Sequence, residues 1–332
     1  MKHRLIAGLL ACIVCNVAVS GQPCPVNGTE LRALMGDELP YPIKSVLWKA
    51  GEPPQTNLLI YSLQPRIYSP DRFKSLATFL GFRSEPQKLP ATILYAPGYW
   101  IKESNPTNKE TWRALIFSEL SGMVRYDSGE DNHKWDLKSK RPAAHGVPNE
   151  GEALNRTLAL LPVLGITTND LEHLPNGQLR YAWNTDGTWY NDRYDNWQRK
   201  RYIRQVNVEF WQRIQAGASV LSIGGGGMLR AGYISEGNLA EIEMTFRNFN
   251  PLGTALPKSS AELVRMLRRG EARSFRASIP ERITVTQCSL VYPQANSSSK
   301  QNFLWPCYSL KADFLDAGET NSLYIYVPLV MK

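Results

Sequence analysis

The chain has 332 residues, of which 43% are hydrophobic and 20% charged, and it contains nine Trp and fifteen Tyr. This balance supplies enough apolar material for packed cores and excludes a chain that is disordered throughout. The formal net charge is +8, but the basic residues are spread along the chain, with denser patches only at residues 198–204 and 265–276. Without a nucleic-acid-binding motif this pattern indicates a mildly basic surface, so no nucleic-acid partner is expected.

The N-terminus has the pattern of a cleavable signal peptide. A basic start at residues 2–4 precedes the uncharged, apolar residues 5–19, and Ala18 and Ser20 supply the small side chains of a cleavage site. The apolar run is shorter than the ~20 residues that a membrane-spanning helix needs. We therefore expect a secreted or periplasmic protein, cleaved near Ser20, with no membrane span. Two alternatives stay open, a retained anchor helix and a lipoprotein acylated at Cys12.

The next segment predicts one helix among strand-like stretches. Residues 21–54 are rich in Pro and Gly and are interpreted as a leader. A helix is predicted over residues 71–80, opened by Pro70 and ended by Gly81. The acidic stretch 127–133 lacks the spacing of a calcium-binding loop, so it is interpreted as a solvated turn and no metal site is expected. Strands are expected at residues 57–63, 92–100 and 123–126.

A second helix is predicted over residues 148–164, ended by Gly165, and the densest aromatic feature of the chain follows it. Residues 183–197 combine Trp and Tyr rings with Asp and Asn side chains, as a sugar or peptide site requires. Because Asp186-Gly187 is also a hairpin signal, the alternative is a hairpin whose rings complete a core or a domain interface. The candidate ligand-binding residues are Trp183, Asp186, Trp189, Tyr190, Tyr194 and Trp197.

Four consecutive glycines occupy residues 224–227, between the strand-like stretches 219–223 and 229–235. They lack the Lys-Ser/Thr pair and the helix of a phosphate-binding loop. We interpret them as a hairpin turn, where glycine permits positive φ, and expect no nucleotide or other cofactor. Further strands are expected at residues 178–183, 204–214 and 242–249.

The last segment predicts a helix followed by strands at residues 283–292, 303–310 and 323–330. Ser259 or Ser260 caps the helix over residues 261–268, and Gly270 ends it. If the first two strands pair, Cys288 and Cys307 can form a disulfide in an oxidising compartment. Two buried free thiols are the alternative, and Cys24 has no obvious partner.

Three times along the chain a short helix is followed by several strands. This order predicts an α+β fold of repeated modules, in which antiparallel sheets are each packed by a short helix. The predicted domains are a signal peptide (1–20), a leader (21–54) and three α+β modules (55–147, 148–256 and 257–332).

Residues 244–252 and the helix after them, which ends in Gly270-Glu271-Ala272, resemble secreted bacterial PepSY-like and YycI-like proteins, which include peptidase-propeptide and YpeB-type proteins. The likeness extends loosely over residues 55–330, with Phe246 where Trp is usual. The resemblance implies cystatin-like modules that act by binding, as regulators of sensor kinases, propeptide-type protease inhibitors or envelope proteins. It supplies no catalytic residues.

No serine-nucleophile elbow, zinc-binding His pair or Cys–His signature surrounds His133, His145 or His173, so we do not expect an enzyme. We expect an exported, non-catalytic binding or regulatory protein that contacts a protein partner in the cell envelope or medium. One alternative is a carbohydrate-binding exported protein that uses residues 183–197. A second is a structural subunit of an extracellular assembly.

Overall fold

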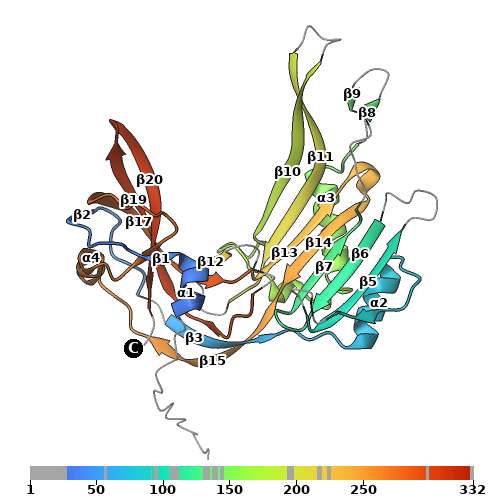
Figure 1. Cartoon of the computed structure of the whole chain (residues 1–332), viewed down its shortest axis with the longest axis horizontal. Coiled ribbons are helices and arrows are strands. Elements are labelled where there is room, and N and C mark those ends of the chain that lie inside the picture. Colours follow the sequence, from blue (N-terminus) through green and yellow to red (C-terminus); the bar gives the residue numbers. More distant parts are fainter. Residues whose placement is uncertain are drawn as a thin grey trace, which may run out of the picture.

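The computed structural model describes residues 28–55, 58–90, 92, 96–104, 112–129, 135–136, 141–142, 146–192, 198–214, 219–222, 226–296 and 299–329. Two large β-sheets rise as two arms on the same side of a small three-stranded sheet (Figure 1). Strands make up 48% of the described residues and helices 17%. The protein is therefore predominantly β.

The larger arm is an eight-stranded antiparallel sheet. Its strands alternate between buried and half-buried residues, as in β14, where Ile242 and Met244 are buried and Glu241 and Glu243 are half-buried. This alternation is typical of a sheet with one covered face. In spatial order the strands are β10 (Tyr181–Asp192), β11 (Gln198–Trp211), β13 (Met228–Tyr233), β14 (Leu239–Thr245), β7 (Met123–Asp127), β6 (Trp112–Ser118), β5 (Gly98–Ser104) and β4 (Gln87–Lys88).

Two helices, α2 (Pro70–Phe79) and α3 (Glu150–Leu160), pack against the covered face. Ser69 caps α2, which has Pro in its first turn, and Asn149 and Glu152 form a capping box at the start of α3. Both predicted helices are present, but α3 ends at Leu160 and not near Leu164 as predicted. The buried helix residues are Phe73, Leu76, Ala77, Ala153, Thr157 and Leu160.

The smaller arm is a seven-stranded sheet. Its main path is β1 (Asp37–Glu38), β16 (Arg273–Ser274), β20 (Glu319–Pro328), β19 (Cys307–Asp316), β17 (Arg282–Gln294) and β12 (Ser219–Ser222), and β2 (Ser45–Trp48) also pairs with β17. The pairs of β17 with β2 and β12 are parallel. Leu263 and Leu267 of α4 (Ser260–Arg269) belong to the core on one face, and Leu31 and Leu34 of α1 (Gly28–Met35) to the core on the other.

The third predicted helix is confirmed as α4. Ser259 and Glu262 form its capping box, and Gly270 ends it in the left-handed conformation.

The base of the molecule is the three-stranded sheet of β15 (Arg247–Ala255), β3 (Leu58–Pro65) and β18 (Phe303–Leu304). β15 follows β14 directly in the chain, so it carries the backbone from the larger arm toward the smaller one. A two-stranded ribbon of β8 (Trp135–Asp136) and β9 (Arg141–Pro142) and the short helices η1 (Thr168–Asp170) and η2 (Ser235–Gly237) complete the described elements.

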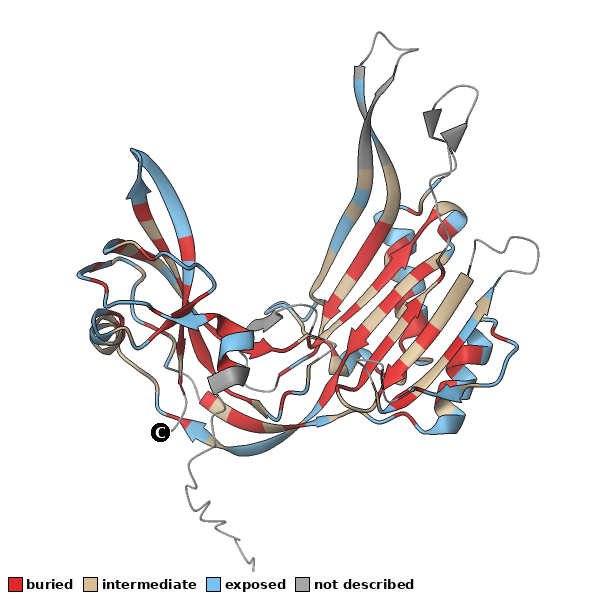
Figure 2. Cartoon of the chain, viewed as in Figure 1, coloured by how far each residue is buried: buried red, intermediate tan, exposed pale blue. Residues whose placement is uncertain are grey.

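A buried arginine ties the base to the smaller arm. Arg247 is only 2% exposed. Figure 2 shows buried residues along the strands of both arms. The Arg247 guanidinium donates to the carbonyl oxygens of Ala295 at 3.3 Å and Ser299 at 3.2 Å, and to Oε1 of Gln301 at 3.4 Å. These contacts hold the segment between β17 and β18 against the first residue of β15.

The hairpin predicted at residues 224–227 is wrong, because β12 and β13 lie in different sheets, while Gly224 and Gly225 lie outside the described residues. A Cβ on Gly226 would lie 1.8 Å from the carbonyl oxygen of Ala295, and one on Gly227 would lie 2.0 Å from Nε2 of Gln294. Close approach of another backbone segment, and not hairpin geometry, therefore requires glycine at residue 226.

The predicted α+β fold with a helix packed on each module's sheet is wrong, because the protein is mostly β-sheet with few helices. Strands from different predicted modules share sheets: β7 pairs with β14, and β3 pairs with β15. Hydrophobic alternation identifies a strand but does not say which strand it pairs with. The predicted domain boundaries themselves stay predictions.

No helix among the described residues has the length and apolar character needed to cross a membrane. The predicted signal peptide, Cys12 and Cys24 lie outside the described residues.

Candidate functional site

The predicted aromatic segment lies on the long β10–β11 hairpin at the free edge of the larger sheet. Trp183 is 38% exposed, and the carboxylate of Asp186 pairs with Arg204 of β11 at 2.5 Å. Trp189 and Tyr190 also belong to β10, whereas Tyr194 and Trp197 lie outside the described residues. Use of these six residues by a ligand stays a prediction.

Asp186-Gly187 is not the turn of this hairpin. Both residues lie inside β10, and the pairing shifts there, because Asp186 is opposite Gln205 while Gly187 is opposite Ile203. The dipeptide therefore marks a β-bulge, which gives strong local twist and tolerates glycine for the same conformational reasons as a turn.

The face of the larger sheet opposite α2 and α3 carries polar side chains in direct cross-strand register. One row runs from Arg125 to Glu243, Arg230 and Glu209 on four neighbouring strands, so opposite charges alternate. Opposite charges on directly paired residues stabilise a sheet by a few tenths of a kcal/mol each, at most about 1 kcal/mol. The alternating charges of this row are therefore explained by their role in stabilising the strand register, without a ligand.

The neighbouring row of cross-strand pairs places two like charges directly opposite each other. Asp127 is directly opposite Glu241, and like charges in that position repel. Nε2 of Gln205 lies 3.2 Å from the Glu241 carboxylate and 2.7 Å from Oδ1 of the buried Asn207. The amide network compensates part of the repulsion, and the room it occupies is available because residue 232 is glycine.

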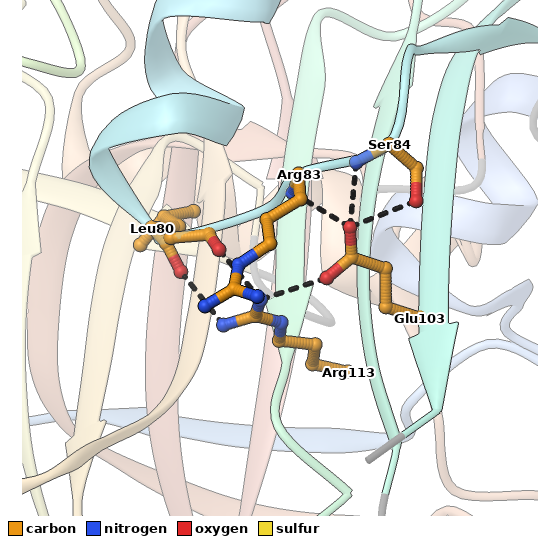
Figure 3. Close-up of polar contacts among 6 residues, drawn as sticks. Leu80, Arg83, Ser84, Glu103 and Arg113 are labelled. Atoms are coloured by element: carbon orange, nitrogen blue, oxygen red, sulfur yellow. Dashed lines mark hydrogen bonds and ion pairs between the residues drawn. The ribbon is translucent and has the colours of Figure 1, made fainter. Parts of the chain in front are cut away.

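A charged clamp fixes the chain after α2 to the strands β5 and β6 (Figure 3). One carboxylate oxygen of Glu103 accepts from the N–H groups of Arg83 at 2.6 Å and Ser84 at 2.7 Å. Its other oxygen accepts from Nη2 of Arg113 at 2.7 Å. Arg113 also donates to the carbonyl of Gly81 at 2.6 Å, two residues past the end of α2.

The clamp fixes the ionisation of Glu103. Partial burial raises the pKa of the Glu103 carboxyl, but the hydrogen bonds from Arg113, Ser84 and Arg83 outweigh burial and lower it to about 2. A carboxylate with so low a pKa is a poor proton acceptor near neutral pH. We therefore interpret Glu103 as a positioning group of the fold and not as a catalytic base.

Glu103→Gln is expected to lower stability near neutral pH and to have little effect in strong acid. The folded pKa lies below the ordinary value of 4.5, so the stabilisation is present above about pH 4.5 and is lost as the pH falls toward 2. Urea unfolding of both proteins across this pH range should give free energies of unfolding that converge at the acid end. A difference that stays constant with pH would contradict the clamp. Glu85→Gln, in an exposed ion pair with Lys74, is the matched control and should change stability by less than about 1 kcal/mol.

A groove of about 1130 Å³ opens beside the clamp. It exceeds the roughly 300–1,000 Å³ of typical small-molecule pockets, so it has room for an elongated ligand. Its lining residues come from the end of α2, the chain after it, and the ends of β5, β6, β7 and β14: Phe79, Leu80, Gly81, Arg83, Ser84, Lys102, Glu103, Ser104, Trp112, Arg113, Tyr126, Ser128, Asn238 and Leu239.

The β19–β20 hairpin of the smaller arm presents an open strand edge. Its two-residue turn is Ala317-Gly318, both with positive φ, and Asp316 is paired with Glu319. In such a hairpin the closing pair is hydrogen-bonded, so alternate residues of β20 direct their N–H and C=O groups away from β19. Those residues include Thr320 and Ser322, which no strand of the described part pairs with on that side.

Exposed apolar side chains lie beside this edge. Leu315 is 76% exposed, Tyr324 54% and Phe275 57%. Leu315 and Tyr324 share one face of the hairpin by their cross-strand register, and the Phe275 ring packs edge-on against Tyr326 of the same face. An open edge with apolar anchors on one face is the arrangement that strand-addition sites use.

The predicted Cys288–Cys307 disulfide is not formed, and both residues are free thiols. Cys307 is paired with Val291 and Cys288 with Leu310, so the two side chains point to opposite faces of the sheet. Burial raises the pKa of the Cys288 thiol to about 12 and also raises that of Cys307. Both are therefore unreactive apolar groups of the core, in line with the alternative of free thiols.

Sequence reasoning missed both the groove and the β20 edge. The groove combines five stretches of the chain that only the fold brings together. The Ala-Gly turn between two apolar strands was a usable hairpin signal, but which strand lies at a sheet edge is not written in the local pattern.

Comparisons with known proteins give no family. No family model matches the chain, and no curated protein matches it. A similar solved structure is that of an uncharacterized protein from Eubacterium rectale, 10% identical, with a TM-score of 0.37 and 85% of each chain covered. The resemblance to PepSY-like and YycI-like proteins stays a prediction.

Proposed function

We propose that this is an exported, non-catalytic binding protein that takes an extended segment of a partner protein onto the free edge of β20. The observation that carries the proposal is the open edge at Thr320 and Ser322 beside the exposed side chains of Leu315, Tyr324 and Phe275. Main-chain hydrogen bonds supply affinity in strand addition, and pockets for alternate side chains supply specificity. The partner segment is expected to carry apolar residues at alternate positions.

The residues of the β20 edge favour binding of a partner strand, because they lack the features that usually keep other strands away. Proteins usually protect an exposed edge strand with Lys, Pro or a bulge, because free N–H and C=O groups recruit other strands. Residues 319–325 contain neither Lys nor Pro, and their pairing with β19 is regular. The outer end of β20 is therefore available to a partner strand.

Ser322→Pro is expected to reduce partner binding at least about tenfold, because proline removes an outward N–H without removing a bond to β19. Ser322→Ala is the matched control: it removes the hydroxyl that donates to Asp313 but keeps the N–H, so binding should be retained. The measurement is quantitative mass spectrometry of proteins captured from envelope extract by each immobilised variant. Hydrogen exchange on the recovered complex should show new protection at residues 320–322.

Two results would count against strand addition. One is a stoichiometric partner captured equally by wild type and Ser322→Pro, and the other is the absence of any stoichiometric partner under mild conditions. Circular dichroism of each variant checks that the proline leaves the sheets intact.

A further inference from the structure

We propose that the groove beside the Glu103–Arg113 clamp binds an acidic oligosaccharide. This site is separate from the β20 edge, since its lining comes from α2 and the larger sheet. Three features of the groove support this ligand: the charge that remains in it, the hydrogen-bonding groups it offers and its apolar walls.

The groove keeps an excess of positive charge after its internal pair is counted. Glu103 and Arg113 neutralise each other at 2.7 Å. Lys102 and Arg83 remain, both exposed, and the Lys102 ammonium lies 4.9 Å from the centre of the Trp112 ring. This cation–π contact fixes Lys102 against Trp112. Both side chains lie on the sheet face opposite Glu103 and Arg113, so they line the groove only at the ends of β5 and β6. The Glu103 carboxylate already accepts three backbone and side-chain donors besides Arg113, so it is shielded from an entering anion.

The groove offers donors but no main-chain pairing. The carbonyls of Leu80 and Gly81 accept from Arg113, and the N–H groups of Arg83 and Ser84 donate to Glu103. β5 is paired on both sides, with β4 and with β6. An extended peptide needs main-chain partners for its own N–H and C=O groups, and the main-chain groups of these segments are already paired.

An acidic sugar chain needs a different set of groups. Its carboxylates require cations, its hydroxyls require side-chain donors and acceptors, and its C–H faces require apolar or aromatic walls. For the carboxylates the groove provides the cations Lys102 and Arg83, and for the hydroxyls it provides the side chains of Ser104 and Asn238. For the C–H faces it provides apolar and aromatic walls from Phe79, which is 55% exposed, and from Leu80, Tyr126 and Leu239.

The test is calorimetric titration of the full chain with hexagalacturonate, with cellohexaose as the neutral match and a short poly-glutamate peptide as the acidic non-sugar. Hexagalacturonate is expected to bind, and the other two to bind at least about tenfold more weakly. Arg83→Glu and Lys102→Glu should each weaken binding of hexagalacturonate by about tenfold or more, because each reverses one contact charge. Lys88→Glu makes the same charge change on β4, outside the groove, and should alter affinity by less than about twofold.

Three results would overturn the assignment. If the folded protein does not bind hexagalacturonate, the groove is not a site for acidic oligosaccharides. Equal binding by Arg83→Glu, Lys102→Glu and wild type places the ligand elsewhere, and equal binding of poly-glutamate replaces the sugar with a general anion. Loss of partner capture by Ser322→Pro is measured separately, so failure of either site leaves the other testable.

Discussion

Arg247→Ala is expected to lower the free energy of unfolding by about 3–5 kcal/mol, because several buried acceptors each lose a charged hydrogen-bond donor at a cost of about 1–3 kcal/mol. The side chain is 2% exposed and donates to the carbonyl oxygens of Ala295 and Ser299 and to Gln301. Alanine leaves these acceptors in a buried site without their donor, and it leaves a cavity where the guanidinium was.

The measurement is urea unfolding followed by circular dichroism, with hydrogen exchange to locate the loss. Protection should fall first in the segment between β17 and β18, which Arg247 holds. Arg268→Ala is the matched control, because Arg268 is exposed on α4, and its stability should stay within about 0.5 kcal/mol of wild type. If Arg247→Ala unfolded at the same urea concentration as Arg268→Ala, the arginine would not be what joins β15 to the smaller arm.

Gly226→Ala is expected to destabilise the protein by about 3 kcal/mol or more, because the added methyl would overlap a backbone atom. Its Cβ would lie 1.8 Å from the carbonyl oxygen of Ala295, and neither group is at the end of a flexible side chain. The segment carrying Gly226 or the end of β17 must then move, and this second segment also provides acceptors to Arg247.

Gly146→Ala is the matched control, since a Cβ on that exposed glycine meets nothing within 4 Å and its φ is not in the left-handed region. Thermal unfolding of the two variants should show a large fall in melting temperature for Gly226→Ala and little change for Gly146→Ala. A soluble Gly226→Ala protein with wild-type melting temperature would show that the close approach to Ala295 does not exist in solution.

The helices were predictable because their ends are local. Pro70 after a capping serine, the Asn149–Glu152 and Ser259–Glu262 capping boxes and the Gly270 terminus are all chemical signals within one turn of the helix they start or stop. The existence of most strands was also predictable from residue type and alternation. Neither property depends on which distant segment becomes the neighbour.

Strand pairing was not predictable, and the wrong interpretations follow from it. Asp186-Gly187 has the composition of a tight turn, yet it is a bulge inside β10 because the hairpin closes further on. Gly226 and Gly227 lie between β12 and β13, strands of different sheets, and the absence of a side chain at Gly226 leaves room for Ala295. Cys288 and Cys307 lie on adjacent strands as expected, but their register places them on opposite faces.

The residues of the proposed binding surfaces could likewise be predicted only in part from the sequence. Trp183 and Asp186 could be selected from composition, and they are on the surface of β10. Lys102, Arg83 and Phe79 have no pattern in common along the chain, and they meet in one groove only because α2 ends over β5 and β6. The value of Ser322 as an edge residue depends on the outer neighbour β16 pairing with β20 only at Tyr326, so that no described strand pairs with β20 at Ser322 on that side.

The parallel pairing of β17 with both β2 and β12 has a consequence for biogenesis. Ribosomes deliver a protein from its N-terminus, so β2 and β12 emerge long before the strand that completes their hydrogen bonding. The larger arm can form early from nearby meanders, whereas the smaller arm must wait until nearly all of the chain has been made. In nascent or truncated chains that stop short of Arg282, β2 and β12 would lack their partner strand β17. Their unpaired N–H and C=O groups would make such chains prone to aggregate unless a chaperone binds them.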